Sequence, residues 1–290
     1  MVYTSVMQSY MEFIQRTRHL INRDGLYGLA RGVGRFVYWQ SGFRSTRYVL
    51  EYKCNGSPVT RTIDGTTASF AVSSPNEYAR ASTVHGERPV VADVLRTLES
   101  DDVFYDVGAN VGTYTCFAGQ VVDDGNVIAF EPHPANVDRL RENAALNDIQ
   151  LEVLSVALSN ERGVSELDVS GGEDRAGVGT HSLSTGDTER SIEIDMVEGD
   201  RLIEEERIPP PTVIKVDVEG AEQLVLEGLL SAIQDDRCHT VYCEVHPDRI
   251  SKFGGSEDDL RELLSERGYT LEVIENRSPE YFLKASRDDE

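Results

Sequence analysis

Short apolar runs alternate with amphipathic stretches along the chain from about residue 88 to its end. The apolar runs occupy 103–107, 127–130, 151–156, 213–218, 240–245, 270–274 and 281–285. Helical spacing of apolar positions precedes and separates them at 88–98, 113–121, 134–146, 221–233 and 257–267. Near-continuous apolar content is typical of strands covered on both faces. The alternation therefore predicts a doubly wound α/β sheet with helices on both faces.

The last two apolar runs are joined only by residues 275–280. This connection has no room for a crossover helix, so the pair is expected to form a hairpin that leaves the final strand antiparallel. Residues 170–190 are rich in Gly, Ser, Thr and Asp. They are expected to form either a lid over the substrate or a solvated loop.

The first part of the chain follows a different pattern, and we divide the sequence into an N-terminal extension, 1–87, and a main domain, 88–290. Residues 1–53 carry eight basic and three acidic residues among apolar positions at helical spacing. Such a segment can lie on an anionic membrane surface. It can also dock on the acidic remainder of the protein. Its apolar stripe is irregular, and this favours docking on the protein over binding to a membrane.

Residues 48–73 contain β-type runs that are split by Asn55-Gly56 and Asp64-Gly65. The runs lie at 48–53, 59–63 and 69–72. Because Asn-Gly and Asp-Gly are strong hairpin signals, this region is expected to form a small antiparallel meander.

Acidic residues outnumber basic ones by 51 to 28, and the formal net charge is −23. This balance disfavours binding to a phosphate backbone, so nucleic acid is not expected as a partner. Only Lys53, Lys215, Lys252 and Lys284 are lysines. An acid-rich, lysine-poor surface is typical of a high-salt cytoplasm, and we take a halophilic source as a hypothesis. A codon bias that favours Arg is the alternative.

The four cysteines show neither a CxxC pair nor zinc-ligand spacing, so neither disulfides nor a structural metal is expected. No apolar run approaches the roughly 18 residues needed to span a bilayer, and the N-terminus lacks the apolar centre of a signal peptide. We therefore expect a cytoplasmic protein. The sequence leaves its oligomeric state open.

The first strand of the main domain runs into Asp106-Val-Gly108-Ala-Asn110-Val-Gly112, and a helix follows. Gly108 and Gly112 allow a ligand to approach the backbone, and the N–H groups of the helix start favour a carboxylate or phosphate. The Gly-x-x-x-Gly spacing differs from the Gly-x-Gly-x-x-Gly of dinucleotide sites. Asp106 suits a ligand that carries an amine and would repel a pyrophosphate.

The next strand ends in Phe130-Glu131-Pro132. A carboxylate at this point accepts both hydroxyls of an adenosine ribose in nucleoside-binding sheets. Together with the preceding glycine motif, Glu131 favours a functional site over a plain tight turn. After the third strand, the backbone near Ala157 either faces the adenine edge or simply forms a turn.

The segment 214–222 places Lys215 and Asp217 on the same side of a strand. A buried Lys needs a partner such as Asp217 or a ligand. The following strand ends in Glu244-Val-His246-Pro. Asp217, Glu244 and His246 are expected to converge at the carboxyl edge of the sheet, as a proton-transfer group or as a divalent-cation site. A capped turn explains His246 equally well, and we assign no metal ligand from the sequence.

These motifs together resemble those of the FkbM family of O-methyltransferases. The resemblance rests on DVGANVG at 106–112, EPHPANVDRL at 131–140, ALSNERG at 157–163, Asp200-Arg201-Leu202, IKVDVEGAE at 214–222 and CEVHP at 243–247. The match runs in order over residues 88–285 and leaves residues 1–53 outside.

The resemblance implies a Rossmann-like class I methyltransferase sheet of seven strands and S-adenosylmethionine as methyl donor. The residues that would contact this cofactor are Asp106, Gly108, Asn110 and Gly112 at its amino-acid end, Glu131 with Pro132 at the ribose, and Ala157 at the adenine. Asp217 would lie near the methyl group. Because the acceptors of the family are varied, we expect O-methylation of a hydroxyl on a saccharide or another small-molecule or glycan acceptor.

Methyl transfer is an in-line displacement, so the protein must hold the acceptor oxygen and remove its proton. We expect Asp217, Glu244 or His246 to act as base and Lys215 to orient the acceptor, with His181 as an outside candidate. A non-catalytic binding protein on a methyltransferase-like fold is one alternative. A nicotinamide-dependent oxidoreductase is the other, and Asp106 and the final hairpin count against it.

Overall fold

The computed structural model describes residues 43–123, 126–169, 182–184 and 190–287. His181 and most of segments 1–53 and 170–190 lie outside the described residues, so membrane contact by the first segment stays a prediction. Among the described residues, no helix is long and apolar enough to cross a membrane. The chain divides into two compact units, Met1–Gly56 with Ser73–Ala79 and Ser57–Val72 with Arg80–Glu290. The division at residue 87 stays a prediction.

In the first unit, α2 (Phe43–Asn55) is a helix where the sequence suggested a strand at 48–53, and that expectation is wrong. Arg47 and Glu51, four residues apart, form an ion pair along this helix. Arg47 Nε lies 2.7 Å from Glu51 Oε1. The Tyr52 ring lies 6.2 Å from the ring of Tyr78 in α3 (Pro75–Thr83). The Arg47–Glu51 ion pair and the contact between the Tyr52 and Tyr78 rings favour the helix over the strand predicted at 48–53.

The Asp64-Gly65 turn joins β1 (Val59–Ile63) and β2 (Thr66–Phe70) in an antiparallel hairpin, as predicted. Both turn residues have positive φ, 45° and 86°, which a two-residue type I′ hairpin requires. With α2 helical, the expected meander is reduced to these two strands. The hairpin belongs to the second unit.

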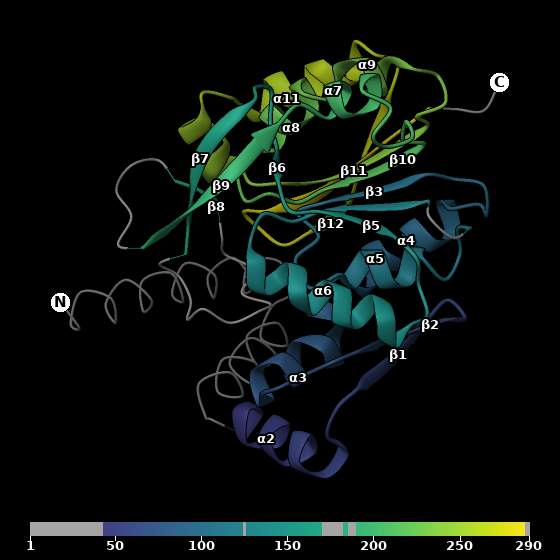
Figure 1. Ribbon diagram of the computed structural model, residues 1–290, viewed down its shortest axis with the longest axis vertical. Coiled ribbons are helices and arrows are strands. Elements are labelled where there is room, and N and C mark those ends of the chain that lie inside the picture. Colours follow the sequence, from purple (N-terminus) through teal and green to yellow (C-terminus); the bar gives the residue numbers. More distant parts are fainter. Residues whose placement is uncertain (1–42, 124–125, 170–181, 185–189, 288–290) are drawn as a thin grey trace, which may run out of the picture. The chain divides into compact units, whose positions relative to one another are not determined.

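A seven-stranded sheet forms the centre of the second unit, in the order β12-β13-β11-β10-β3-β4-β5 (Figure 1). Its strands are β3 (Phe104–Val107), β4 (Val127–Phe130), β5 (Glu152–Leu154), β10 (Val213–Val216), β11 (Thr240–Val245), β12 (Thr270–Asn276) and β13 (Tyr281–Ser286). Neighbouring strands are parallel except β13, which is antiparallel to β11 and β12. The predicted sheet with its antiparallel last strand is confirmed.

Helices cover both faces of this sheet, as Figure 1 shows. On one face lie α4 (Arg88–Thr97), α5 (Thr113–Ala118) and α6 (Pro134–Leu146). On the other lie α7 (Gly199–Glu204), α8 (Glu222–Glu227), α9 (Leu230–Gln234) and α11 (Glu257–Ser265). Short turns at η1 (Val84–Gly86), α10 (Pro247–Ile250) and η2 (Ser251–Phe253) complete the described helices.

The expected single helix at 221–233 is divided into α8 and α9. The division falls at Gly228, where an added Cβ would lie 1.9 Å from the carbonyl oxygen of Ser159. Asp200 accepts hydrogen bonds from the N–H groups of Ser231 and Ala232 at 2.7 and 2.9 Å. The Asp200 side chain thus caps α9 from another part of the chain. The break depends on such long-range contacts, which the spacing of apolar residues within 221–233 does not predict.

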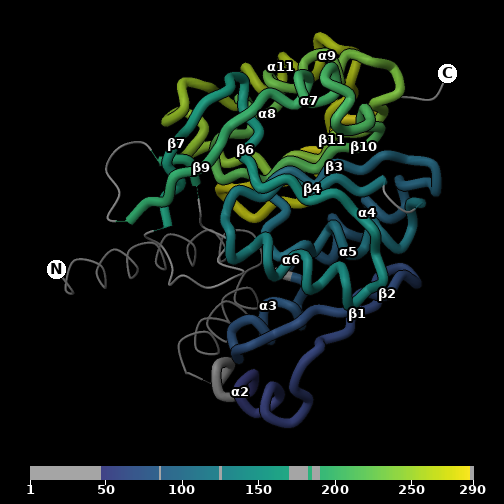
Figure 2. Tube along the Cα trace, in the orientation of Figure 1, coloured from purple at the N-terminus to yellow at the C-terminus, as the bar shows by residue number. Residues whose placement is uncertain are grey.

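A second sheet, which the sequence analysis did not predict, has the order β6-β9-β7-β8. Its strands are β6 (Ala157–Leu158), β7 (Gly163–Asp168), β8 (Ser182–Leu183) and β9 (Ser191–Val197). The two long strands, β7 and β9, run side by side in Figures 1 and 2 and pair in antiparallel register. Its small core contains Leu167, Val169 and Ile194. These apolar residues are too few, within a polar stretch of sequence, to predict the strands.

Candidate active site

A cavity lies at the carboxyl ends of β3, β4 and β10, where ligands bind in doubly wound sheets. It encloses about 700 Å³ of empty space, part of it open to solvent. Among the residues expected to bind the cofactor, Gly108, Asn110, Glu131, Pro132 and Ala157 line it. The second sheet contributes Leu167, Ser182 and Leu183 to the wall of this cavity.

The loop after β3 passes directly over the end of β10 at Gly108. A Cβ on Gly108 would lie 1.9 Å from the carbonyl oxygen of Asp217, and the φ of Gly108 is +72°. Only glycine fits both the close contact and the left-handed conformation. Gly112 also has positive φ, +82°, but it lies outside the cavity wall at the start of α5.

Glu131 at the end of β4 holds the loop around Asn110. One carboxylate oxygen accepts the N–H of Asn110 at 2.7 Å, and the other accepts the N–H of His133 at 2.8 Å and the Asn136 amide at 3.2 Å. Burial raises the pKa of Glu131 above its usual value, while these hydrogen bonds oppose the rise. The ribose contact expected of Glu131 stays a prediction, and the structure adds this positioning of the loop.

Asp106 is fully buried and does not line the cavity. Its Oδ2 accepts hydrogen bonds from the N–H and the hydroxyl of Thr115 at 3.0 and 2.6 Å, which caps the first turn of α5. Its Oδ1 lies 3.2 Å from Lys215 Nζ. The structure therefore places Asp106 beneath the glycine loop, where direct contact with a cofactor has no support.

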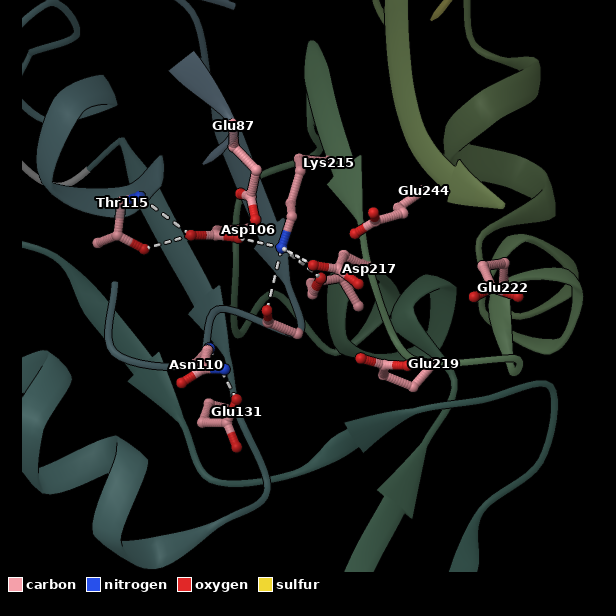
Figure 3. Close-up of polar contacts among 12 residues, drawn as sticks. Glu87, Asp106, Asn110, Thr115, Glu131, Lys215, Asp217, Glu219, Glu222 and Glu244 are labelled. Atoms are coloured by element: carbon pink, nitrogen blue, oxygen red, sulfur yellow. Dashed lines mark hydrogen bonds and ion pairs between the residues drawn. The ribbon is translucent and has the colours of Figure 1, made fainter. Parts of the chain in front are cut away.

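Lys215 is 2% exposed, and its side chain extends from β10 toward the same loop (Figure 3). Its ammonium donates to the carbonyl oxygen of Gly108 at 3.0 Å and lies 3.7 Å from Asp217 Oδ2. Burial by itself lowers the pKa of Lys215, but Asp106 and Asp217 outweigh it, so the pKa is raised above its usual value. Lys215 is a positioning residue that ties the loop to β10.

Besides Asp106, the carboxylates of Glu87, Asp217 and Glu244 lie around the Lys215 ammonium in Figure 3. Of the predicted bases that the structure describes, only Asp217 lines the cavity. Glu244 pairs with Arg277 of the β12–β13 connection at 3.2 Å, and its charge also acts on His246. Burial and the nearby charge of Asp217 raise the pKa of Glu244 to about 8.

Glu87 and Arg277 were missed by the sequence analysis. Arg277 Nη1 lies 3.6 Å from Glu87 Oε1, and the Glu87 side chain is only 12% exposed. Burial, followed by the charge of Asp217, raises the pKa of Glu87 to about 7. Nothing in the local sequence distinguishes either residue from surface charges, because they meet only through the fold.

His246 follows β11 and lies between two carboxylates of the β10–α8 turn. Its Nδ1 lies 2.6 Å from Glu222 Oε1, and its Nε2 lies 3.4 Å from Glu219 Oε2. Burial alone lowers the pKa of His246, but the bond to Glu222 outweighs it and raises the pKa to about 9. Arg249 also contacts Glu219. Glu222 therefore orients a neighbouring ring besides standing at a helix start.

The sequence model of the family described as "Methyltransferase FkbM domain" matches residues 106–271. The hexuronic acid methyltransferase AglP of Haloferax volcanii is 35% identical over 80% of this chain and 91% of its own length. The 31-O-demethyl-FK506 methyltransferase FkbM of Streptomyces tacrolimicus is 29% identical over 60% of this chain and 75% of its own length.

A solved structure of methyltransferase FkbM from Methylobacillus flagellatus is also similar, with a TM-score of 0.43 and 15% identity. It covers 73% of this chain and 54% of that chain. The extent of the family match and the identity to AglP establish the relationship that the motifs suggested. The chain is a methyltransferase and belongs to the FkbM methyltransferase family.

Proposed function

We propose that this methyltransferase transfers a methyl group from S-adenosylmethionine to an oxygen atom of a saccharide. The observation that carries the proposal is the charge of the cavity wall. The wall contains the carboxylates of Glu131, Asp217 and Glu219 and, among the described residues, no basic side chain. Such a wall favours a cationic ligand such as a sulfonium and disfavours the pyrophosphate of a nicotinamide dinucleotide.

The residues of the glycine loop fit this cofactor. Gly108 leaves backbone in the wall where a side chain would otherwise stand. Asn110 also lines the cavity, and its side-chain oxygen is buried without a hydrogen-bond partner among the described residues. An amine or hydroxyl of a bound nucleoside derivative would satisfy that oxygen. Glu131 retains acceptor capacity for ribose hydroxyls, because each of its oxygens has two lone pairs.

S-adenosylmethionine supplies an electrophilic methyl group when it is bound. The chain must hold the acceptor hydroxyl in line with that group and accept the hydroxyl proton. Asp217 is the group that we assign to proton acceptance, since its side chain is 22% exposed and faces the cavity. Lys215 pairs with Asp217 and holds it in place. Glu244 pairs with Arg277 and does not line the cavity.

The saccharide acceptor is proposed from the relatives. The relative that is 35% identical over 80% of this chain is described as acting on a hexuronic acid. A sugar acid is therefore the first acceptor class to assay. Neutral hexoses provide the comparison.

The test is calorimetric titration of the full chain with S-adenosylhomocysteine, in molar KCl and in low salt, with NADH as the negative ligand. We expect one-site binding that Glu131→Gln weakens at least ten-fold. Glu262→Gln, an exposed change on α11, is the matched control and should bind as the wild type does. Absence of binding in a folded wild-type protein would refute the proposal.

Turnover then separates cofactor binding from proton transfer. Asp217→Asn should retain S-adenosylhomocysteine binding within a few-fold and lose at least one-hundred-fold in methyl transfer to a hexuronic acid, since positioned bases contribute about 10²–10⁴-fold. Unchanged turnover in Asp217→Asn would remove Asp217 from the mechanism while leaving the cofactor assignment intact.

A further inference from the structure

Three side chains at and beside the cavity wall present potential metal ligands to one point. Asp217, Glu219 and His246 each offer one ligand atom, and these atoms all lie within 4.8 Å of one another. Asp217 and Glu219 come from the turn after β10, and His246 follows the neighbouring strand β11. The carboxyl ends of adjacent parallel strands bring them together.

The His246 ring is held as metal-ligating imidazoles are held. Its Nδ1 lies 2.6 Å from Glu222 Oε1, and this bond directs Nε2 toward Glu219 and the cluster. Metal-ligating His residues almost always make such a bond from the other ring nitrogen, often to a carboxylate. The bond fixes both the orientation of the ring and the nitrogen that is available to a metal.

The charge and hydrogen bonding of Glu222 give a second, independent indication of a cation. Glu222 is 0% exposed, and its Oε2 is buried without a hydrogen-bond partner among the described residues. Its Oε1 has only the Gly220 N–H and His246 Nδ1 as partners. A carboxylate buried in this way requires positive charge nearby, and the His246 ring provides it either as an imidazolium or by carrying the charge of an ion bound at Nε2.

The cluster also has room for further ligands. Asp217 and Glu219 both line the cavity, so an ion held by them would face the space where an acceptor binds. Arg249 and His246 Nε2 both lie next to Oε2 of Glu219, so Oε1 of Glu219 is the oxygen that would coordinate an ion. Three protein ligands with open positions are typical of catalytic rather than structural metal sites.

We propose that Asp217, Glu219 and His246 bind a divalent cation, with Glu222 as the partner of the His246 ring. Two carboxylates and one imidazole suit Mn²⁺ or Mg²⁺ with water or acceptor oxygens in the remaining positions. This inference rests on the proposed function for its role, which is to hold the acceptor hydroxyl oxygen and lower the pKa of that hydroxyl. The proton passes to the free oxygen of Asp217 as the O–CH₃ bond forms and the S–CH₃ bond breaks.

The test measures metal binding without turnover. The full chain is treated with EDTA, returned to molar KCl to screen its many surface carboxylates, and titrated with Mn²⁺ while free Mn²⁺ is followed by electron paramagnetic resonance. We expect one Mn²⁺ per chain. His246→Ala and Glu219→Gln should each weaken binding at least ten-fold, and Glu222→Gln should weaken it about 10- to 100-fold.

Glu262→Gln controls for the loss of one carboxylate and should leave the affinity unchanged. S-adenosylhomocysteine titration of the same variants keeps the two proposals separate, because that ligand needs Glu131 rather than the cluster. Intact S-adenosylhomocysteine binding with no stoichiometric Mn²⁺ would overturn the metal site alone and leave His246 as part of an ion-pair network. The same follows if both Glu219→Gln and His246→Ala bind Mn²⁺ as tightly as the wild type.

Discussion

The ammonium of Lys215 lies 3.2 Å from Asp106 Oδ1, and the two side chains are 2% and 0% exposed. The pair joins β10 to β3 directly below the glycine loop. It explains why a lysine stands among the apolar residues of a buried strand: its charge has a fixed partner, and its remaining protons reach carbonyl oxygens of the loop, including that of Gly108. Both groups are engaged with each other and with the backbone or first turn that follows β3.

Lys215→Met is expected to destabilise the protein by about 3–5 kcal/mol, because it leaves the buried Asp106 carboxylate without its cation. The double variant Lys215→Met/Asp106→Asn should recover part of this loss. Urea unfolding gives the free energies. Lys252→Met, an exposed change, is the control. Equal destabilisation in the single and double variants would contradict the pairing.

Gly108→Ala is expected to abolish cofactor binding and to destabilise the fold by more than Gly65→Ala does. Both glycines have positive φ, +72° and +86°, which costs a non-glycine residue about 1 kcal/mol. Only Gly108 has a neighbour in the way, the Asp217 carbonyl oxygen. Urea unfolding and S-adenosylhomocysteine titration measure the two effects. Equal losses in both variants would mean that the close approach is unimportant.

Glu87→Gln is expected to change the pH dependence of stability. Burial and Asp217 raise the pKa of Glu87 from 4.5 to about 7, so the folded state binds more protons than the unfolded state between these pH values. Stability contributed by the protonated group is therefore lost as pH rises through this window. The variant should gain stability relative to the wild type from pH 5 to pH 8 in unfolding titrations. A difference that does not vary with pH would count against the prediction, and Glu262→Gln provides the baseline.

Salt is expected to stabilise the folded chain. With a net charge of −23, repulsion among carboxylates opposes the compact state, and salt screens that repulsion. The melting temperature should rise between low salt and molar KCl. A melting temperature that is insensitive to KCl would reject the halophilic hypothesis.

Local patterns anticipated much of the main domain. The spacing of apolar residues predicted the seven strands, and the shortness of 275–280 predicted the antiparallel β13. Helical spacing predicted α11 at 257–267, and Ser256 caps its first turn, because its hydroxyl accepts the N–H of Asp259 at 3.0 Å. These features succeed because strand burial, hairpin length and helix capping depend on residues that are near in sequence.

The failures have a common physical cause. The strand expected at 48–53 is helical, and the helix expected at 221–233 is broken where Gly228 meets Ser159. The second sheet was not predicted because β7 and β9 bury only a few apolar side chains each. In each case the apolar pattern of the local sequence was too weak to decide the conformation.

By itself, the sequence determined the α/β sheet, the glycine loop, the family motifs and the acidic character of the chain. Only the tertiary structure decided which of the motif carboxylates faces the cavity. Asp106 lies in β3, Asp217 follows the adjacent strand β10, and both contact Lys215, yet Asp106 is buried beneath the loop and Asp217 lines the wall. That distinction depends on burial and long-range packing, as does the meeting of Glu87 with Arg277, so a pattern of neighbouring residues does not contain it.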